Sequence, residues 1–333
     1  MEMVGDKKES KSGCEFDPSR RNLVVSFIRY AIGLTLLDVF LPEIACSKTS
    51  AEGKKTPGKL LKKASPSIDG KTIARAQKGD PYSLTRRAVE ALGGMSVFVK
   101  KGERVMLMPN IGWDRSPEQA ACTHPEVVRA VIEMCKDAGA GEVGVFCHSC
   151  HPAQSTYKTS GIADASDKAG ARLWYVSPDP DFETVDVGGK RLQKVRVFKE
   201  LLKSDRFINI PIAKVHSLSV LTMAMKNLLG AVEDRPSLHP DIHNNLPELA
   251  RILKPDLNIL DATRILVRNG PTGGSLADVE KPEMVIAGSN IVSVDAVGAG
   301  LFGKEPSTLR FLTIANSMGL GEYNLGKLKI VEA

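Results

Sequence analysis

Alternation between strand-like and helix-like apolar spacing is the feature that most restricts the fold of this chain. Arg104 to Met108 predicts a short strand. Pro125 to Ala138 has apolar residues at helical spacing, with Thr123 as the expected cap and Gly139 at its end. Val143 to Phe146 predicts the next strand. A strand, a helix and a strand in this order favour a right-handed parallel unit.

The same alternation continues through the rest of the chain. Further strands are expected at 172–176, 184–187, 194–198, 206–212, 257–260 and 284–287. Helices are expected at 86–92, 155–169, 218–229, 246–253, 293–302 and 307–318. This order predicts an α/β fold with a mixed, mainly parallel sheet and helices on both faces.

Two N-terminal regions precede the expected α/β domain at 84–333. Residues 1–47 contain a twin-arginine pattern, Ser19 to Val24, and an apolar run, Val24 to Ala45. They predict an export signal or a membrane anchor, and Cys46 stands where a lipoprotein carries its acylated cysteine. Residues 48–83 have the Lys, Ser, Gly and Pro content of a linker. We therefore expect a periplasmic or cell-envelope protein whose membrane contact is confined to the N-terminal segment.

The distribution of charge argues against a nucleic-acid partner. The formal net charge is +6, but residues 1–65 hold twelve of the 45 basic and eight of the 39 acidic residues. The remainder of the chain carries only +2, and aromatic residues make up 5% of the whole. A basic binding face and aromatic stacking platforms are both missing from this pattern.

Candidate functional residues follow the expected strands. Cys147, His148, Cys150 and His151 come directly after Phe146. The other residues in equivalent positions are Asn110, Lys214, His216 and Asp261. Because ligands bind beyond the carboxyl ends of parallel strands, we expect these loops to meet at one crevice.

The cysteines and histidines after Phe146 allow three interpretations. Cys147, Cys150 and His151 spell C-x-x-C-H, the attachment signature of a c-type haem. Twin-arginine export of a folded chain weakens that interpretation. Alternatively, Cys147 and Cys150 form a redox-active dithiol or a plain structural disulfide.

A metal ion or an iron–sulfur cluster is the third interpretation, because thiolate and imidazole groups suit zinc, copper and iron–sulfur centres. The expected metal ligands are His124, Cys147, His148, Cys150 and His151. His216, His239 and His243 are available to complete such a site. The wider set of expected cofactor-binding residues is Asn110, Cys147, Cys150, His151, Asn269 and Gly273.

Two other segments carry weaker signals. Asn269 to Gly274 is a glycine-rich loop that lacks the Lys and Ser or Thr of a Walker phosphate loop, so a tight turn is expected. Lys226 and Asn227 lie in an expected helix, where one or both line the crevice or face solvent.

At these residues the chain resembles the family built on the domain of unknown function 362, several members of which carry twin-arginine leaders or ferredoxin-like iron–sulfur domains. The similarity covers Arg104 to Gly303. Its carriers are Met108 to Gly112, Thr123 to Pro125, Ser160 to Ile162, Asn209 to Ser217, Ala224 to Gly230, Pro255 to Asp261, Asn269 to Gly273 and Ser293 to Ala296. Many exported relatives look like Asp-His-Thr-Cys at 147–150, so Cys147 departs from the family pattern. The resemblance implies no settled activity.

These observations leave an enzyme, a binding protein and a structural protein open. As an enzyme, the expected catalytic residues are His148, Cys150, Lys214 and His216, acting in a redox or carbon-centred reaction. As a binding protein, the same crevice holds a metal or a small anionic ligand. The expected partners are a redox protein or that small anion, and no nucleic acid.

Overall fold

The computed structural model describes residues 68–333. The expected leader, Cys46 and most of the expected linker lie outside the described residues. The strands are β1 Thr72–Gln77, β2 Arg104–Pro109, β3 Glu142–Phe146, β4 Arg172–Trp174, β5 Phe182–Asp186, β6 Lys194–Phe198, β7 Arg206–Ile210, β8 Ile212–His216, β9 Val220–Thr222, β10 Leu257–Leu266, β11 Val279–Glu280, β12 Met284–Gly288 and β13 Lys329–Glu332. The α-helices are α1 Pro81–Glu90, α2 Pro125–Asp137, α3 Ala153–Thr159, α4 Ile162–Lys168, α5 Lys199–Leu202, α6 Ala224–Asn227, α7 Ile242–Leu253, α8 Ile291–Ala299 and α9 Arg310–Ser317.

One large sheet organises the described residues. Its main path has the order β13-β1-β12-β10-β7-β2-β3-β4, with β8, β9 and β11 attached beside β10. The run from β10 to β4 is parallel throughout, and β12 is antiparallel to both of its neighbours. The prediction of a mixed, mainly parallel sheet is therefore confirmed.

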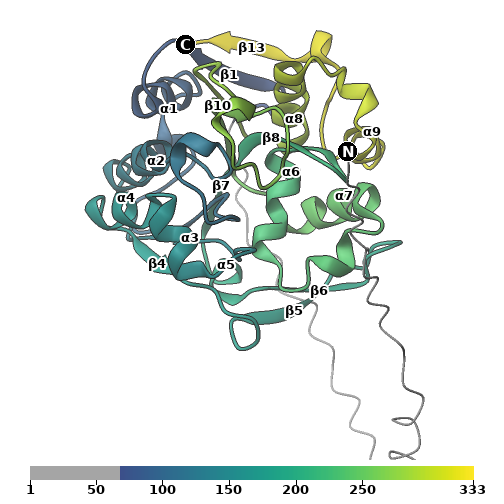
Figure 1. Ribbon diagram of the computed structural model, residues 1–333, viewed down its shortest axis with the longest axis horizontal. Coiled ribbons are helices and arrows are strands. Elements are labelled where there is room, and N and C mark those ends of the chain that lie inside the picture. Colours follow the sequence, from purple (N-terminus) through teal and green to yellow (C-terminus); the bar gives the residue numbers. More distant parts are fainter. Residues whose placement is uncertain (1–67) are drawn as a thin grey trace, which may run out of the picture. The chain divides into compact units, whose positions relative to one another are not determined.

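Helices cover both faces of this sheet. Successive side chains of a strand point to opposite faces, so strands with apolar residues at every position need cover on both sides. In β2, Val105 and Leu107 pack into one apolar core, whereas Met106 and Met108 pack into the other. The first core includes residues of α1, α2 and α4, and the second includes residues of α6 to α9. Figure 1 shows these two groups of helices on either side of the strands.

Several element boundaries differ from the sequence-based expectation. The helix expected at 155–169 is divided into α3 and α4 at Gly161, which has a positive φ of 72°, and the strand expected at 206–212 ends at Ile210. The folded region begins before Leu84, because β1 already pairs with β12 and β13. β10 continues to Leu266, so Asp261 is a buried strand residue and not a loop residue. The segment 218–229, expected as one helix, forms β9, the short helix α6 and the start of a 3-10 turn.

The helix expected at Pro125 is present as α2, but His124 caps it in place of Thr123. The Nδ1 atom of His124 accepts a hydrogen bond from the Glu126 amide at 3.1 Å. Thr123 donates its hydroxyl hydrogen to the Ile210 carbonyl group at 2.7 Å. None of the helices within residues 68–333 combines the length and the hydropathy that a bilayer span requires.

Candidate functional site

A crevice of about 400 Å³ lies beyond the carboxyl ends of β2 and β3 and beside the β8–β9 hairpin. Its volume is within the range of small-molecule pockets, roughly 300–1,000 Å³. Six expected site residues line it, namely Asn110, Cys147, His148, Cys150, Lys214 and His216. Residues that were not expected there also line it, including Trp113, Leu218, Thr222, Arg235, Pro236 and Pro271. The structure therefore brings two expected loops together with Lys214 and His216, which lie on strand β8 and not in the loop expected for them. The roles of these residues stay predictions.

The loop at 147–151 is held by hydrogen bonds on several sides. The Cys147 amide donates to the Tyr157 hydroxyl group at 2.7 Å, and the His148 amide donates to the Gly230 carbonyl group at 2.8 Å. The Cys150 amide donates to the Gly112 carbonyl group at 2.9 Å. These bonds fix the position of the Cys150 and His148 side chains in the crevice wall.

Arg235 holds the same loop through two hydrogen bonds. Its guanidinium group donates to the His148 carbonyl oxygen and, at 2.8 Å, to the Ser149 carbonyl oxygen. The planar fork of arginine matches two adjacent acceptors. Arg235 therefore positions the loop and also contributes a positive charge to the crevice.

The β8–β9 hairpin contributes three polar side chains to the lining of the crevice, those of Lys214, His216 and Thr222. Lys214 and His216 are two residues apart on β8, so their side chains share one face of the strand. Thr222 on β9 is the direct antiparallel partner of Lys214, which places its side chain on that face as well. The Thr222 side chain is buried, and its Oγ1 atom has no hydrogen-bond partner among the residues that the structure describes.

A chain of side-chain amides connects this hairpin to the central strands. The Nζ atom of Lys214 donates to Asn110 Oδ1 at 3.1 Å, and Asn110 Nδ2 donates to Asn227 Oδ1 at 2.8 Å. Asn227 in turn donates to the Met108 carbonyl oxygen and to Asn209 Oδ1. A satisfied buried network of this kind fixes the relative position of its members.

The short helix α6 carries Lys226 into the crevice. The buried Asp295 of α8 accepts the amides of Ala224 at 2.6 Å and Met225 at 3.0 Å, which fixes the first turn of α6. Burial raises the pKa of Asp295 to about 7. The Nζ atom of Lys226 lies 3.4 Å from His239 Nε2.

Two buried lysines dominate the electrostatics of the crevice. The Lys214 side chain is 1% exposed, and burial lowers its pKa to about 8. Burial also lowers the pKa of Lys226 to about 8, and the positive charges of Lys214 and Arg235 add to that effect. Within residues 68–333, no Asp or Glu side chain lines the crevice. The positive charge is therefore not neutralised by a carboxylate in its wall.

The three histidines of the crevice are neutral near pH 7. Burial lowers the pKa of His216 to about 3, and burial also lowers the pKa values of His148 and His239. His148 and His239 each place Nδ1 near a backbone carbonyl oxygen, at 2.8 and 2.7 Å, so their Nε2 atoms are acceptors. His216 Nδ1 accepts the Leu218 amide at 3.0 Å, which leaves its Nε2 atom as a donor.

Four expected site residues lie outside the crevice lining. His124 caps α2, and His151 packs edge-to-face on Trp113 while its Nδ1 atom accepts the Asp114 amide. Asn269 donates to Asp278, and Gly273 has a positive φ of 55° in the turn that was expected there. Their loop reaches the crevice through Pro271 instead.

The expected metal ligands do not converge. Among the described residues, no three His, Cys, Asp or Glu side chains are close enough to hold a metal ion. Cys147 and Cys150 are free thiols, so the structure does not contain the disulfide between them that was one alternative. Burial raises the pKa of Cys147 to about 12, and its side chain is 3% exposed. Covalent haem would require this thiol to leave the apolar core.

Sequence reasoning missed Thr222, Arg235 and the apolar rim residues, and it named His239 only as an additional metal ligand. Thr222 lay in an expected helix, where its pairing with Lys214 has no sequence signal. Arg235 is followed by Pro236 in a polar stretch, Glu233 to Ser237, that reads as an ordinary turn.

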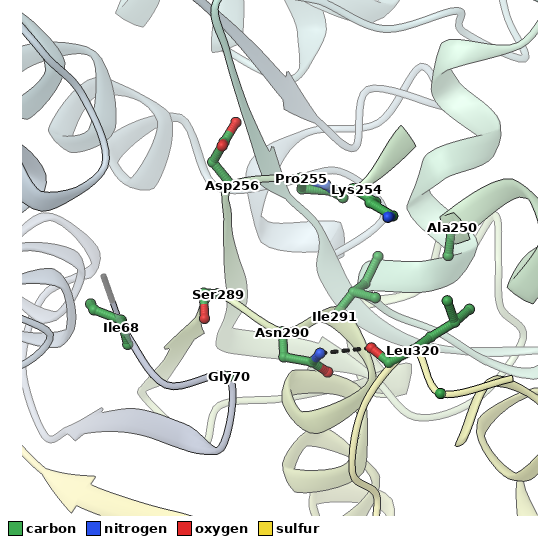
Figure 2. A pocket seen from close by; sticks show the side chains of 11 residues that line it. Ile68, Gly70, Ala250, Lys254, Pro255, Asp256, Ser289, Asn290, Ile291 and Leu320 are labelled. Atoms are coloured by element: carbon green, nitrogen blue, oxygen red, sulfur yellow. Dashed lines mark hydrogen bonds between the residues drawn. The ribbon is translucent and has the colours of Figure 1, made fainter. Parts of the chain in front are cut away.

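A second hollow of about 310 Å³ lies near the start of β10, at the opposite end of the parallel strands. Figure 2 shows residues that line it, including Lys254, Asp256 and Asn290. Asn290 caps α8 through Oδ1 and donates from Nδ2 to the Leu320 carbonyl oxygen at 2.7 Å. Asp256 accepts the Phe207 amide at 2.9 Å and faces Arg206 at 3.5 Å. The side chains of Asn290 and Asp256 are thus already engaged by the protein.

Comparison with known proteins gives a family match over the crevice-bearing region. The sequence profile described as Domain of unknown function (DUF362) matches residues 105–300. The chain is also similar to the thylakoid-associated protein sll1697 of Synechocystis sp., with 28% identity over 267 residues, 75% of this chain and 79% of that protein.

Two solved structures have a lower similarity. The lactate racemase apoprotein from Thermoanaerobacterium thermosaccharolyticum matches with a TM-score of 0.46 and 12% identity, over 68% of this chain and 56% of that one. A structural-genomics protein from Thermotoga maritima matches with a TM-score of 0.38 and 10% identity, over 62% of this chain and 55% of that one. The chain thus spans little more than half the length of either.

Proposed function

The chain belongs to the DUF362 family, and we propose that it binds a small organic anion in the crevice. The observation that carries this proposal is the enclosed positive charge of Lys214, Lys226 and Arg235 without a carboxylate among the described lining residues. Burying an ammonium group without a counter-charge is unfavourable. A lowering of a lysine pKa from 10.5 to about 8 corresponds to roughly 3 kcal/mol. An anionic ligand would offset part of that free energy.

The rim of the crevice favours a ligand that also has an apolar part. Trp113, Leu218, Pro236 and Pro271 surround the cationic interior. Leu218 is 51% exposed and belongs to this apolar rim. A molecule with a carboxylate at one end and an apolar body at the other matches both parts of the lining.

Calorimetric titration at pH 7 with 3-phenylpropionate tests the proposal, with the uncharged analogue 3-phenylpropanol as the comparison ligand. We expect the anion to bind and the alcohol to bind much more weakly. Lys214→Met should weaken anion binding at least about tenfold, because a hydrogen bond to a charged group contributes about 1.5–3 kcal/mol. Lys254→Met, at the second hollow, is the matched control and should bind as the unaltered protein does. Equal binding of acid and alcohol would contradict the proposal.

We further propose that the protein acts outside the cytoplasm or at a membrane. The support is the twin-arginine pattern at Ser19 to Val24, the apolar run after it and the similarity to a protein described as thylakoid-associated. Replacing Arg20 and Arg21 by Lys in the full chain should leave the protein in the cytoplasmic fraction. Unchanged fractionation of that variant would count against export by this route.

A further inference from the structure

The two crevice lysines differ in how firmly the protein holds their amino groups. Lys214 donates to Asn110 Oδ1 and, at 2.6 Å, to the Ala121 carbonyl oxygen. Lys226 has one longer contact, 3.4 Å from Nζ to His239 Nε2. The ammonium group of Lys214 is therefore held in one position, where it can bind the carboxylate of a ligand. The amino group of Lys226 is available to react with a ligand.

His239 is oriented to take a proton from Lys226. Its Nδ1 atom lies 2.7 Å from the Arg235 carbonyl oxygen, which requires the hydrogen on Nδ1 and leaves a lone pair on Nε2. That lone pair lies on the nitrogen atom 3.4 Å from Lys226 Nζ. A desolvated lysine beside other cations is the usual environment of an amine that reacts with carbonyl compounds.

We propose that Lys226 Nζ condenses with the ketone carbon of a 2-oxo acid bound in the crevice and forms a protonated imine. This inference rests on the proposed function, because the carboxylate of the acid must first be held by the crevice cations. In a 2-oxo acid the ketone is adjacent to the carboxylate, so a ligand anchored at Lys214 presents its reactive carbon inside the same enclosed volume.

The step is balanced without an oxidant or reductant. The Lys226 ammonium group gives one proton to His239 Nε2, and the freed lone pair forms a C–N bond while the C=O π pair moves to oxygen. That oxygen takes up two protons, one returned from His239 and one from the nitrogen, and leaves as water. The net change converts one ammonium group and one ketone into one protonated imine and one water molecule.

Thr222 provides the remaining polar contact that this step needs. Its side chain is 4% exposed and lines the crevice, and its hydroxyl group has no partner within residues 68–333. The cross-strand pairing with Lys214 keeps this hydroxyl group beside the anchored end of the ligand. A hydroxyl group there can donate to the carboxylate or to the oxygen of the tetrahedral adduct.

Reductive trapping tests the inference on the full chain. The protein is incubated with phenylpyruvate and sodium cyanoborohydride at pH 7, and peptides are mapped by mass spectrometry. We expect a secondary-amine adduct on Lys226, present in most molecules and at least about tenfold more abundant than on any other lysine. 3-Phenylpropionate, which has no ketone, should prevent the adduct by competition and form none itself.

Each outcome decides between the two proposals. An adduct that maps to Lys214, or is spread over surface lysines such as Lys254, overturns the imine assignment. Binding of phenylpyruvate without any adduct also overturns it while leaving the anion-binding function intact. Failure of both 3-phenylpropionate and phenylpyruvate to bind overturns both. Lys226→Arg should lose the adduct while the matched Lys254→Arg retains it, and the mapping on the unaltered protein stands even if the first variant does not fold.

Discussion

The crevice and the second hollow are similar in volume, about 400 and 310 Å³, but they differ in the state of their polar groups. In the second hollow, Asn290 and Asp256 are hydrogen-bonded to the protein itself. In the crevice, two lysines carry charges that the wall does not neutralise, and Thr222 Oγ1 has no partner within the described residues. Cavity size alone therefore does not identify a binding site, whereas uncompensated polar groups inside a cavity do.

The largest expected difference between the two hollows concerns protein stability. Replacing the lysine of the crevice, but not that of the second hollow, should change how the unfolding free energy depends on pH. The pKa of Lys214 is about 8 in the folded protein and 10.5 as a free side chain, so the unfolded state binds more protons between these values. The contribution of Lys214 to stability therefore rises with pH in that window. We expect the unfolding free energy of the unaltered protein, relative to Lys214→Met, to increase by roughly 3 kcal/mol from pH 7 to pH 11.

Urea denaturation at several pH values measures this difference. Lys254→Met at the second hollow is the control and should show no comparable trend. A constant difference between the unaltered protein and Lys214→Met would mean that Lys214 is not desolvated as the crevice geometry requires.

The affinity for an anion should fall as the crevice lysines lose their protons. An amine with a pKa of about 8 is about 3% protonated at pH 9.5, so binding that requires one such charge should weaken about thirtyfold between pH 7 and pH 9.5. 3-Phenylpropionate keeps its charge over this range, and calorimetry gives the affinities. A pH-independent affinity would contradict the assigned role of the lysines.

Thr222→Val should weaken ligand binding with little change in the stability of the fold. We expect the affinity for 3-phenylpropionate to fall about tenfold, because the variant lacks the hydroxyl group proposed to donate to the anion. Little stability should be lost, because that group has no hydrogen-bond partner in the part of the chain that the structure describes. Thr263→Val is the matched control, since the Thr263 hydroxyl group donates to Asp261 at 2.7 Å. That variant should lose stability and keep its affinity, and the reverse pattern would refute the assignment.

Asn290→Ala should have the smallest effect and should act only on the second hollow. Its side-chain oxygen accepts the amides of Val292 and Ser293, which caps α8. Loss of such a cap lowers stability by about 1 kcal/mol. The affinity of the crevice for 3-phenylpropionate should not change. A loss of affinity in this variant would show that the two ends of the sheet are coupled.

The arrangement of the crevice could be predicted where it follows from strand direction alone. Parallel strands place Asn110 and the 147–151 loop at one edge of the sheet, and the alternation of apolar segments was sufficient to infer this. The family prediction was confirmed, since the family profile matches residues 105–300.

The hairpin that carries Lys214 could not be predicted in the same way. The apolar residues between Leu218 and Leu229 fit helical spacing, but pairing of β9 with β8 overrides that local preference. Val220 adopts a positive φ of 67° at this turn, a conformation that its sequence does not suggest. Burial of the lysines and the lack of a partner for Thr222 depend on distant segments, so no single stretch encodes them.

Attachment of the β8–β9 hairpin beside the main path of the sheet also bears on how this fold can diversify. β9 pairs only with β8 among the described strands, so replacements at Leu218 or Thr222 leave the register of the long parallel strands unchanged. Substitutions at a few hairpin positions can therefore change the ligand preference while the scaffold of parallel strands stays the same. The same positions are where a protein engineer would begin to retune selectivity.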